Sequence, residues 1–207
     1  MGSAIFFNSI NVRVPWDKIY GRLGYRKHTT SMDEKRRRET DNDIEYALSL
    51  INIKGAVKRV PLSGGRGDGI SLSTGEVFVS RDLVKYIGDC DEVLIMGATA
   101  GDSIMDAIHR DVDSQNLTRG SILDAVASEM TDGALDWICD YFNHQLKREN
   151  KRVGRSRYSA GYGDLKLENQ KTIYRMLELK KIGVSITENN ILIPEKSVTA
   201  IARIMNV

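Results

Sequence analysis

The sequence predicts an α+β fold in which a twisted, mainly antiparallel sheet packs against a block of helices. Strand-like segments occur both early and late in the chain, and the longest helical stretch lies between them. Strands that come in clusters, rather than in strict alternation with helices, favour this class over a parallel sheet. The chain has 207 residues, of which 41% are hydrophobic, so we expect a single domain over residues 1–207.

Helical signals occur in five segments of the chain. Residues 33–53 repeat apolar side chains at helical spacing. Ser80 is a favourable N-cap, and Gly88 a favourable terminator, for the helix between them. Gly133 interrupts the longest segment and indicates either a break or a close helix crossing. The five predicted helices cover residues 15–24, 33–53, 81–87, 117–150 and 167–181.

The predicted strands are short apolar or alternating runs. A turn at 73–75, which ends in glycine, favours a hairpin between two of them. In the last strand, even-numbered residues from 198 to 204 face one side and odd-numbered residues face the other. Residues 147–157 are basic and almost without apolar side chains, so an exposed connection is expected there. The predicted strands cover residues 57–60, 70–72, 76–79, 93–96, 191–193 and 198–205.

Composition and charge argue against several classes of function. The net charge is +2, from 30 basic and 28 acidic residues, which gives no electrostatic footprint for nucleic acid or an anionic membrane. No apolar run approaches the ~20 residues that span a bilayer, and the N-terminus has no signal-peptide pattern. Cys90 and Cys139 form no Cys-x-x-Cys pair, and His28, His109 and His144 are scattered, so no metal site is expected. We therefore expect a cytoplasmic protein that binds neither nucleic acid nor membranes.

Two glycine-rich segments and one acidic helix face have simple interpretations. Residues 97–102 follow an apolar strand, as a dinucleotide-binding loop would, but they lack the full Gly-x-Gly-x-x-Gly pattern and fit an ordinary strand-to-helix turn. Residues 64–69 fit a flexible hairpin tip better than a phosphate loop. Acidic residues in the longest helix, including Asp132 and Asp136 one turn apart, fit a solvated face. No catalytic residue is predicted.

The segment Arg157-Tyr-Ser-Ala-Gly-Tyr-Gly-Asp164 has the features of a ligand site. Arginine binds carboxylates with a rigid pair of donors. Gly161 allows a ligand to approach the backbone closely, and the rings of Tyr158 and Tyr162 can pack on an adenine or a cationic sulfur. These features suit an anionic molecule with a flat ring. A twisted loop whose tyrosines pack on the sheet explains the same residues equally well.

The last quarter of the chain resembles the reactivation domain of cobalamin-dependent methionine synthase. The resemblance rests on elements that occur in the family's order at closely matching spacing. These are Arg157-x-x-x-Gly161-Tyr162, a helix-forming segment at 170–183, the segment 186–194 with Thr187-Glu188 and Pro194, and a strand beginning Ser197-Val-Thr-Ala.

This resemblance implies a C-shaped α+β domain that binds S-adenosylmethionine in an open groove. By position, Arg157 matches the family arginine that holds the methionine carboxylate. Gly161 and Tyr162 match the turn beside the ligand. Tyr158 and Ala160 stand where the family has Pro-Ala-Pro, and they are further candidates for binding the ligand. Asp17 is a candidate match for an acidic ligand contact near the start of the family domain. The chain itself would then bind and position the ligand, without a metal ion of its own.

The resemblance also implies a partner. This sequence has no Asp-x-His-x-x-Gly cobalamin signature, so the cobalamin would belong to a separate corrinoid methyltransferase protein. A stand-alone reactivation protein would assist reductive methylation of cob(II)alamin there, with an electron from a flavodoxin- or ferredoxin-type donor. The family continues past its final strand with paired tyrosines that contact the ligand, whereas this sequence ends at Val207. The alternative is therefore a non-catalytic docking or regulatory subunit of a corrinoid methyltransferase complex.

Overall fold

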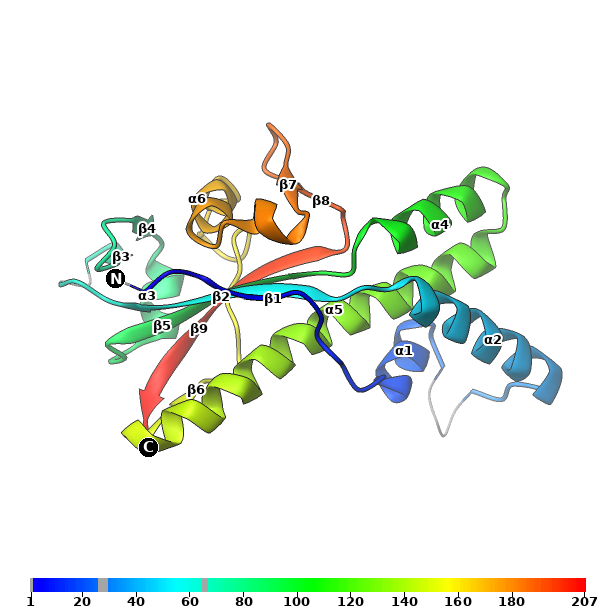
Figure 1. Cartoon of the computed structure of the whole chain (residues 1–207), viewed down its shortest axis with the longest axis horizontal. Helices are drawn as coiled ribbons and strands as arrows, with labels where there is room; N and C mark the ends of the chain where they lie inside the picture. The colour runs from blue at the N-terminus through cyan, green and yellow to red at the C-terminus, as the bar shows by residue number, and fades with distance from the viewer. Residues whose placement is uncertain (1, 26–29, 65–66) are drawn as a thin grey trace.

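A five-stranded sheet forms the centre of the computed structural model, which describes residues 2–25, 30–64 and 67–207 (Figure 1). Every neighbouring pair of strands in this sheet is antiparallel. The predicted α+β class with a mainly antiparallel sheet is therefore confirmed. In spatial order, the strands are β1 (Ile5–Phe7), β2 (Lys54–Pro61), β5 (Glu92–Thr99), β9 (Ser197–Asn206) and β6 (Lys151–Val153).

The three central strands pair over eight residues at each interface. β5 pairs with β2 from Glu92 to Thr99, and the same eight residues pair with β9 on the other side. The alternation predicted for the last strand is confirmed, because Ala200, Ala202 and Ile204 belong to one hydrophobic cluster and Ile201 to the other. The sheet thus has two buried faces and separates two cores.

Four helices cover one face of the sheet. The long helix α5 runs obliquely across it, and the other three pack around α5 (Figure 1). The core between them includes Leu123 and Ile138 of α5 and Leu94 and Met96 of β5. The four helices are α1 (Trp16–Arg22), α2 (Glu34–Leu50), α4 (Asp102–Asp113) and α5 (Leu117–Leu146).

Smaller elements cover the opposite face. Phe78 and Leu83 pack there with Ile173 and Leu177 against the sheet residue Ile95. The predicted hairpin and the predicted helix between Ser80 and Gly88 are both present. The elements are β3 (Gly69–Ser71), β4 (Val77–Val79), α3 (Arg81–Ile87), α6 (Asn169–Met176), η2 (Leu179–Ile182), β7 (Ser185–Ile186) and β8 (Leu192–Ile193).

Gly133 marks a close approach, and not a break, in the long helix. α5 continues through this position from Leu117 to Leu146. A Cβ atom at Gly133 would lie 2.6 Å from Cγ1 of Val12. The glycine therefore lets the chain segment before α1 cross the helix, whereas the sequence suggested a crossing between two helices.

Several predicted boundaries are wrong. Residues 147–157 contain the edge strand β6 and are not simply an exposed connection. The predicted helix at 167–181 is divided into α6 and η2, because Glu178 has a left-handed backbone with φ of 50°. Residues 97–99 are the end of β5, so the motif at 97–102 is a strand end followed by a turn. The N–H of Gly101 donates to Thr99 Oγ1 at 3.2 Å in that turn.

Some predictions fall on parts of the chain outside the described residues. These are His28 and the centre of the glycine-rich segment, Gly65 and Arg66. The single-domain organisation over residues 1–207 also stays a prediction.

Candidate functional site

Residues 157–164, called here the 157–164 turn, run along the outer edge of β9 between β6 and α6 (Figure 1). The N–H of Tyr158 donates to the carbonyl of Ile201 at 2.8 Å, and the N–H of Ile201 donates back at 2.7 Å. Ser159 Oγ donates to the carbonyl of Thr199 at 2.8 Å. The turn thus covers a part of the β9 edge that β6 leaves unpaired, and its backbone is fixed to the sheet.

Glycine shapes the second half of the turn. Gly161 and Gly163 have φ values of 90° and 52°, a region that residues with a Cβ atom rarely adopt. The N–H of Gly161 donates to the carbonyl of Leu165 at 2.8 Å, and the N–H of Leu165 donates to the carbonyl of Tyr162 at 2.9 Å. These bonds close a compact loop that presents Tyr162 to solvent with 68% of its surface exposed.

Asp164 anchors the end of the turn on α3. Its carboxylate accepts hydrogen bonds from the hydroxyl of Ser80 and from the N–H groups of Arg81 (2.8 Å) and Asp82 (3.3 Å). The bond from Ser80, followed by those from the two N–H groups, outweighs partial desolvation and lowers the pKa of Asp164. The sequence identified Ser80 as the N-cap of α3, which its bond from Leu83 N–H at 2.9 Å confirms. It gave no sign that Asp164 completes the cap.

Arg157 extends from the turn toward α5. Its Nη1 donates to Oδ1 of Asp136, and its side chain is 21% exposed. Burial works against the charged guanidinium, but the hydrogen bond and the charge of Asp136 outweigh it, so the pKa of Arg157 is raised. The predicted carboxylate-binding residue therefore already holds a carboxylate of its own chain.

Asp136 also connects Arg157 to α1. Its Oδ2 lies 3.7 Å from Nζ of Lys18, in the first turn of that helix. Asp17, the candidate acidic contact, precedes Lys18 directly and is exposed. The first turn of α1, the middle of α5 and the start of the 157–164 turn thus come together through one row of charges, Lys18, Asp136 and Arg157.

The two tyrosines lie on the other side of the sheet edge. Tyr158 packs with the core beneath α3, and its ring centroid is 5.6 Å from that of Tyr86. Its hydroxyl donates to the carbonyl of Tyr162 at 3.1 Å, and Ala160 packs on the same core. The structure therefore separates Arg157 from the Tyr158 ring. Of the two sequence interpretations, packing on the sheet holds for Tyr158, while Tyr162 remains exposed.

The acidic residues of α5 are not a simple solvated face, which corrects the prediction from their spacing. Asp124 pairs with Nζ of Lys196 at 2.6 Å, and Glu129 pairs with Nε of Arg22 at 2.8 Å. Asp136 pairs with Arg157 as described above. The partners come from distant parts of the chain, so spacing within the helix gave no indication of them.

Two surface cavities flank this region. A groove of about 690 Å³ lies between the β3–β4 hairpin and residues 164–169, and includes Ser80 and Asp164 in its wall. Val77 and Val79 line it with 55% and 65% of their surface exposed. This groove adjoins the Asp164 anchor and has both apolar and polar walls.

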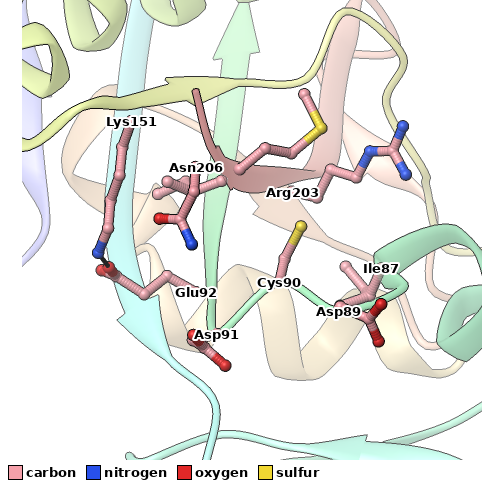
Figure 2. A pocket seen from close by; sticks show the side chains of 10 residues that line it. Ile87, Asp89, Cys90, Asp91, Glu92, Lys151, Arg203 and Asn206 are labelled. Carbon is pink, nitrogen blue, oxygen red and sulfur yellow. Dashed lines mark hydrogen bonds and ion pairs between the residues drawn. The ribbon is translucent and has the colours of Figure 1, made fainter.

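The second cavity, of about 320 Å³, lies between the end of α3 and the ends of β6 and β9. Figure 2 shows Lys151 joined to Glu92 on one side of it, with Cys90 near the centre and Arg203 on the other side. Arg203 Nη1 donates to the carbonyl of Tyr86 at 3.1 Å. The two cations of this cavity are thus held by other groups of the protein.

Neither a metal-binding cluster nor a membrane-spanning helix is present in the described ranges 2–25, 30–64 and 67–207. No group of three or more His, Cys, Asp or Glu side chains in these ranges is arranged to hold a metal ion. No helix there is long and apolar enough to cross a membrane.

Comparison with known proteins identifies the fold. No family profile matches this sequence, and no curated protein matches it either. Among solved structures, the chain is similar to the crystal structure of the MetH reactivation domain bound to AdoHcy. The TM-score is 0.67 at 16% sequence identity, and the match covers 92% of this chain and 73% of the other. The fold that the sequence resemblance implied is therefore confirmed: this chain has the fold of the MetH reactivation domain.

Proposed function

We propose that this protein binds S-adenosylmethionine and assists the reductive methylation of cob(II)alamin on a separate corrinoid methyltransferase protein. The fold shared with a domain that was crystallised with AdoHcy carries this proposal. The Arg157-x-x-x-Gly161-Tyr162 segment supports it, because this segment resembles the family motif beside the ligand.

In this proposal the side chains position the ligand and perform no acid–base step. Arg157 would hold the methionine carboxylate, a charge-assisted pairing that arginine favours. Gly161 would let the ligand approach the backbone, and the exposed ring of Tyr162 could face the adenine or the sulfonium. Tyr158 and Ala160 would support the turn from the sheet side. Positioning of this kind lowers a barrier by holding reacting groups in place.

The transfer itself would occur on the partner. The sulfonium loses its methyl group as the carbon–sulfur bond breaks, and S-adenosylhomocysteine leaves with that bonding pair. The reduced corrinoid of the partner supplies the pair for the new bond to carbon. One electron, from a flavodoxin- or ferredoxin-type donor, reduces the corrinoid beforehand.

Titration calorimetry with S-adenosylmethionine tests the ligand. We expect wild type to bind, and Arg157→Ala to bind about ten-fold more weakly or worse, because a charge-assisted pair is lost. Arg157→Lys keeps the charge but not the planar pair of donors, and should lie between the two. Arg155→Ala, an exposed cation nearby, is the control. Absence of heat at millimolar ligand, both from wild type and from an Asp136→Asn variant in which Arg157 is free of its ion pair, would contradict the proposal.

A non-catalytic docking or regulatory role in a corrinoid complex is the second candidate. The observation that favours it is the ion pair of Arg157 with Asp136, which occupies one donor of the proposed anchor. In this case the chain should bind a purified corrinoid protein with the same affinity in the presence and absence of S-adenosylmethionine. Affinity that depends on this ligand would instead favour the first proposal.

A further inference from the structure

We propose that Asp136 sets the affinity of Arg157 for its ligand by competing with the ligand carboxylate, and that Lys18 receives Asp136 when the ligand binds. This inference rests on the proposed function, since it concerns the same anchor. It adds an internal competitor and a second partner for that competitor, both contributed by elements far from the 157–164 turn in sequence.

Asp136 is in direct contact with Arg157. Asp136 presents to Arg157 the same chemical group, a carboxylate, as the proposed ligand. Two carboxylates that approach one guanidinium repel each other, and an arginine binds one of them best when both of its parallel donors are available. An Nη1 occupied by Asp136 therefore lowers the affinity for a second carboxylate.

Of the two partners, Asp136 is the more exposed and the freer to move. Tyr158, the residue after Arg157, exchanges two backbone hydrogen bonds with Ile201. The backbone at Arg157 is therefore held at the sheet edge. The Arg157 side chain is 21% exposed, whereas that of Asp136 is 50% exposed. A half-exposed carboxylate can rotate into water at little cost. The exchange is therefore expected at Asp136 and not at Arg157.

A second cation, Lys18, lies beside Asp136. Lys18 Nζ lies 3.7 Å from Oδ2 of Asp136, whereas Arg157 contacts Oδ1, and the lysine side chain is 61% exposed. An exposed pair of this kind is weak, but Lys18 can still pair with Asp136 after Asp136 has left Arg157. Lys18 should thus favour the state that binds ligand.

Three variants separate these roles in calorimetric titrations with S-adenosylhomocysteine and S-adenosylmethionine. Asp136→Asn keeps the size of the side chain and removes its charge, so binding should tighten by about ten-fold. Lys18→Gln removes the second cationic partner of Asp136, so ligand binding should weaken by about two- to five-fold. The double variant should match Asp136→Asn alone, because Lys18 acts only through Asp136.

Asp132→Asn is the matched control. This residue lies one helical turn before Asp136 and affects Arg157 through charge without an ion pair between them. Its removal tests whether any loss of negative charge on α5 is sufficient, and we expect less than about a two-fold change because such interactions are screened. Thermal unfolding of each variant verifies that it is folded.

The outcomes are distinct. Tighter binding by Asp136→Asn, with little effect of Asp132→Asn, supports the inference, including the case in which wild type binds too weakly to measure. If wild type binds and Asp136→Asn binds equally or more weakly, the inference is wrong while the proposed function stands. If neither wild type nor Asp136→Asn binds either compound, the proposed function fails, and the inference fails with it.

Discussion

The hydroxyl of Ser80 donates to the carboxylate of Asp164, which lies 84 positions later in the chain. Ser80 is the N-cap of α3, and Asp164 is the last residue of the 157–164 turn. Because the same carboxylate also accepts from two N–H groups of the first helical turn, the start of the helix and the end of the turn form one hydrogen-bonded unit. The position of the proposed ligand turn thus depends on α3 as well as on β9.

Removal of the Asp164 carboxylate should loosen both elements together. We expect Asp164→Ala to lower the melting temperature and to speed hydrogen exchange at the N–H groups of Arg81 and Asp82, which lose their acceptor. Asp68→Ala is the control, because within the described part of the chain Asp68 pairs with the exposed side chain of Arg81 alone, at 2.8 Å. Equal exchange rates in wild type and Asp164→Ala, measured by nuclear magnetic resonance, would contradict this account.

The contact between Gly133 and Val12 gives a prediction about packing. Gly133→Ala places a Cβ atom 2.6 Å from Val12 Cγ1. Overpacking of this kind costs about 1–3 kcal/mol, which exceeds the gain of about 1 kcal/mol that alanine brings to a helix. Urea unfolding should therefore show a loss of stability.

Two further variants make the packing test specific. Gly21→Ala in α1 meets nothing within 4 Å, so it should gain about 0.5–1 kcal/mol. Val12→Ala removes the clashing methyl group, so Gly133→Ala should be harmless or stabilising in that background. A loss of the same size in both backgrounds would show that the close approach of Val12 is not the cause.

Local signals predicted much of the fold. The cap at Ser80, the glycine after α3 and the alternation in β9 depend on neighbours in sequence, and all three are confirmed. In the central sheet, sequence reasoning missed the strands β1 and β6, which have three residues each. They are strands because of the longer strands beside them, so their own residues carry little signal. The left-handed backbone that divides the predicted helix lies at Glu178. Because this residue is not a glycine, the sequence did not indicate it.

Sequence reasoning identified the segment that forms the candidate site, but not how its side chains are arranged in space. Arg157 and Tyr158 are adjacent, and an extended chain at a sheet edge directs adjacent side chains to opposite faces. To predict that separation, residues 151–158 would have to be recognised as an edge of the sheet. The basic composition of 147–157 indicated an exposed connection instead. The pairing of Arg157 with Asp136 required the path of α5 across the sheet, and helical spacing alone does not contain that path.

A charge cluster at the end of the sheet predicts how stability depends on pH. Glu92 accepts a hydrogen bond from Arg59 Nη2 at 2.8 Å and also pairs with Lys151. Hydrogen bonding from Arg59 chiefly, opposed by burial and aided by Lys151, lowers the pKa of Glu92 to about 2 from its ordinary value of 4.5. A carboxylate whose pKa is depressed by folding stabilises the folded state above its unfolded pKa. This contribution should be fully present above about pH 4.5 and should be lost as the pH falls toward 2.

Urea unfolding of wild type and Glu92→Gln across this range checks the assignment. Wild type should be more stable at neutral pH, and the difference between the two proteins should narrow as the pH falls below about 4.5, because protonated Glu92 and glutamine are both neutral. Glu149, whose pKa Arg59 lowers and the charge of Glu92 raises, also titrates in both proteins. If the gap is constant from neutral pH down to pH ~3, the ionised form of Glu92 does not stabilise this end of the sheet.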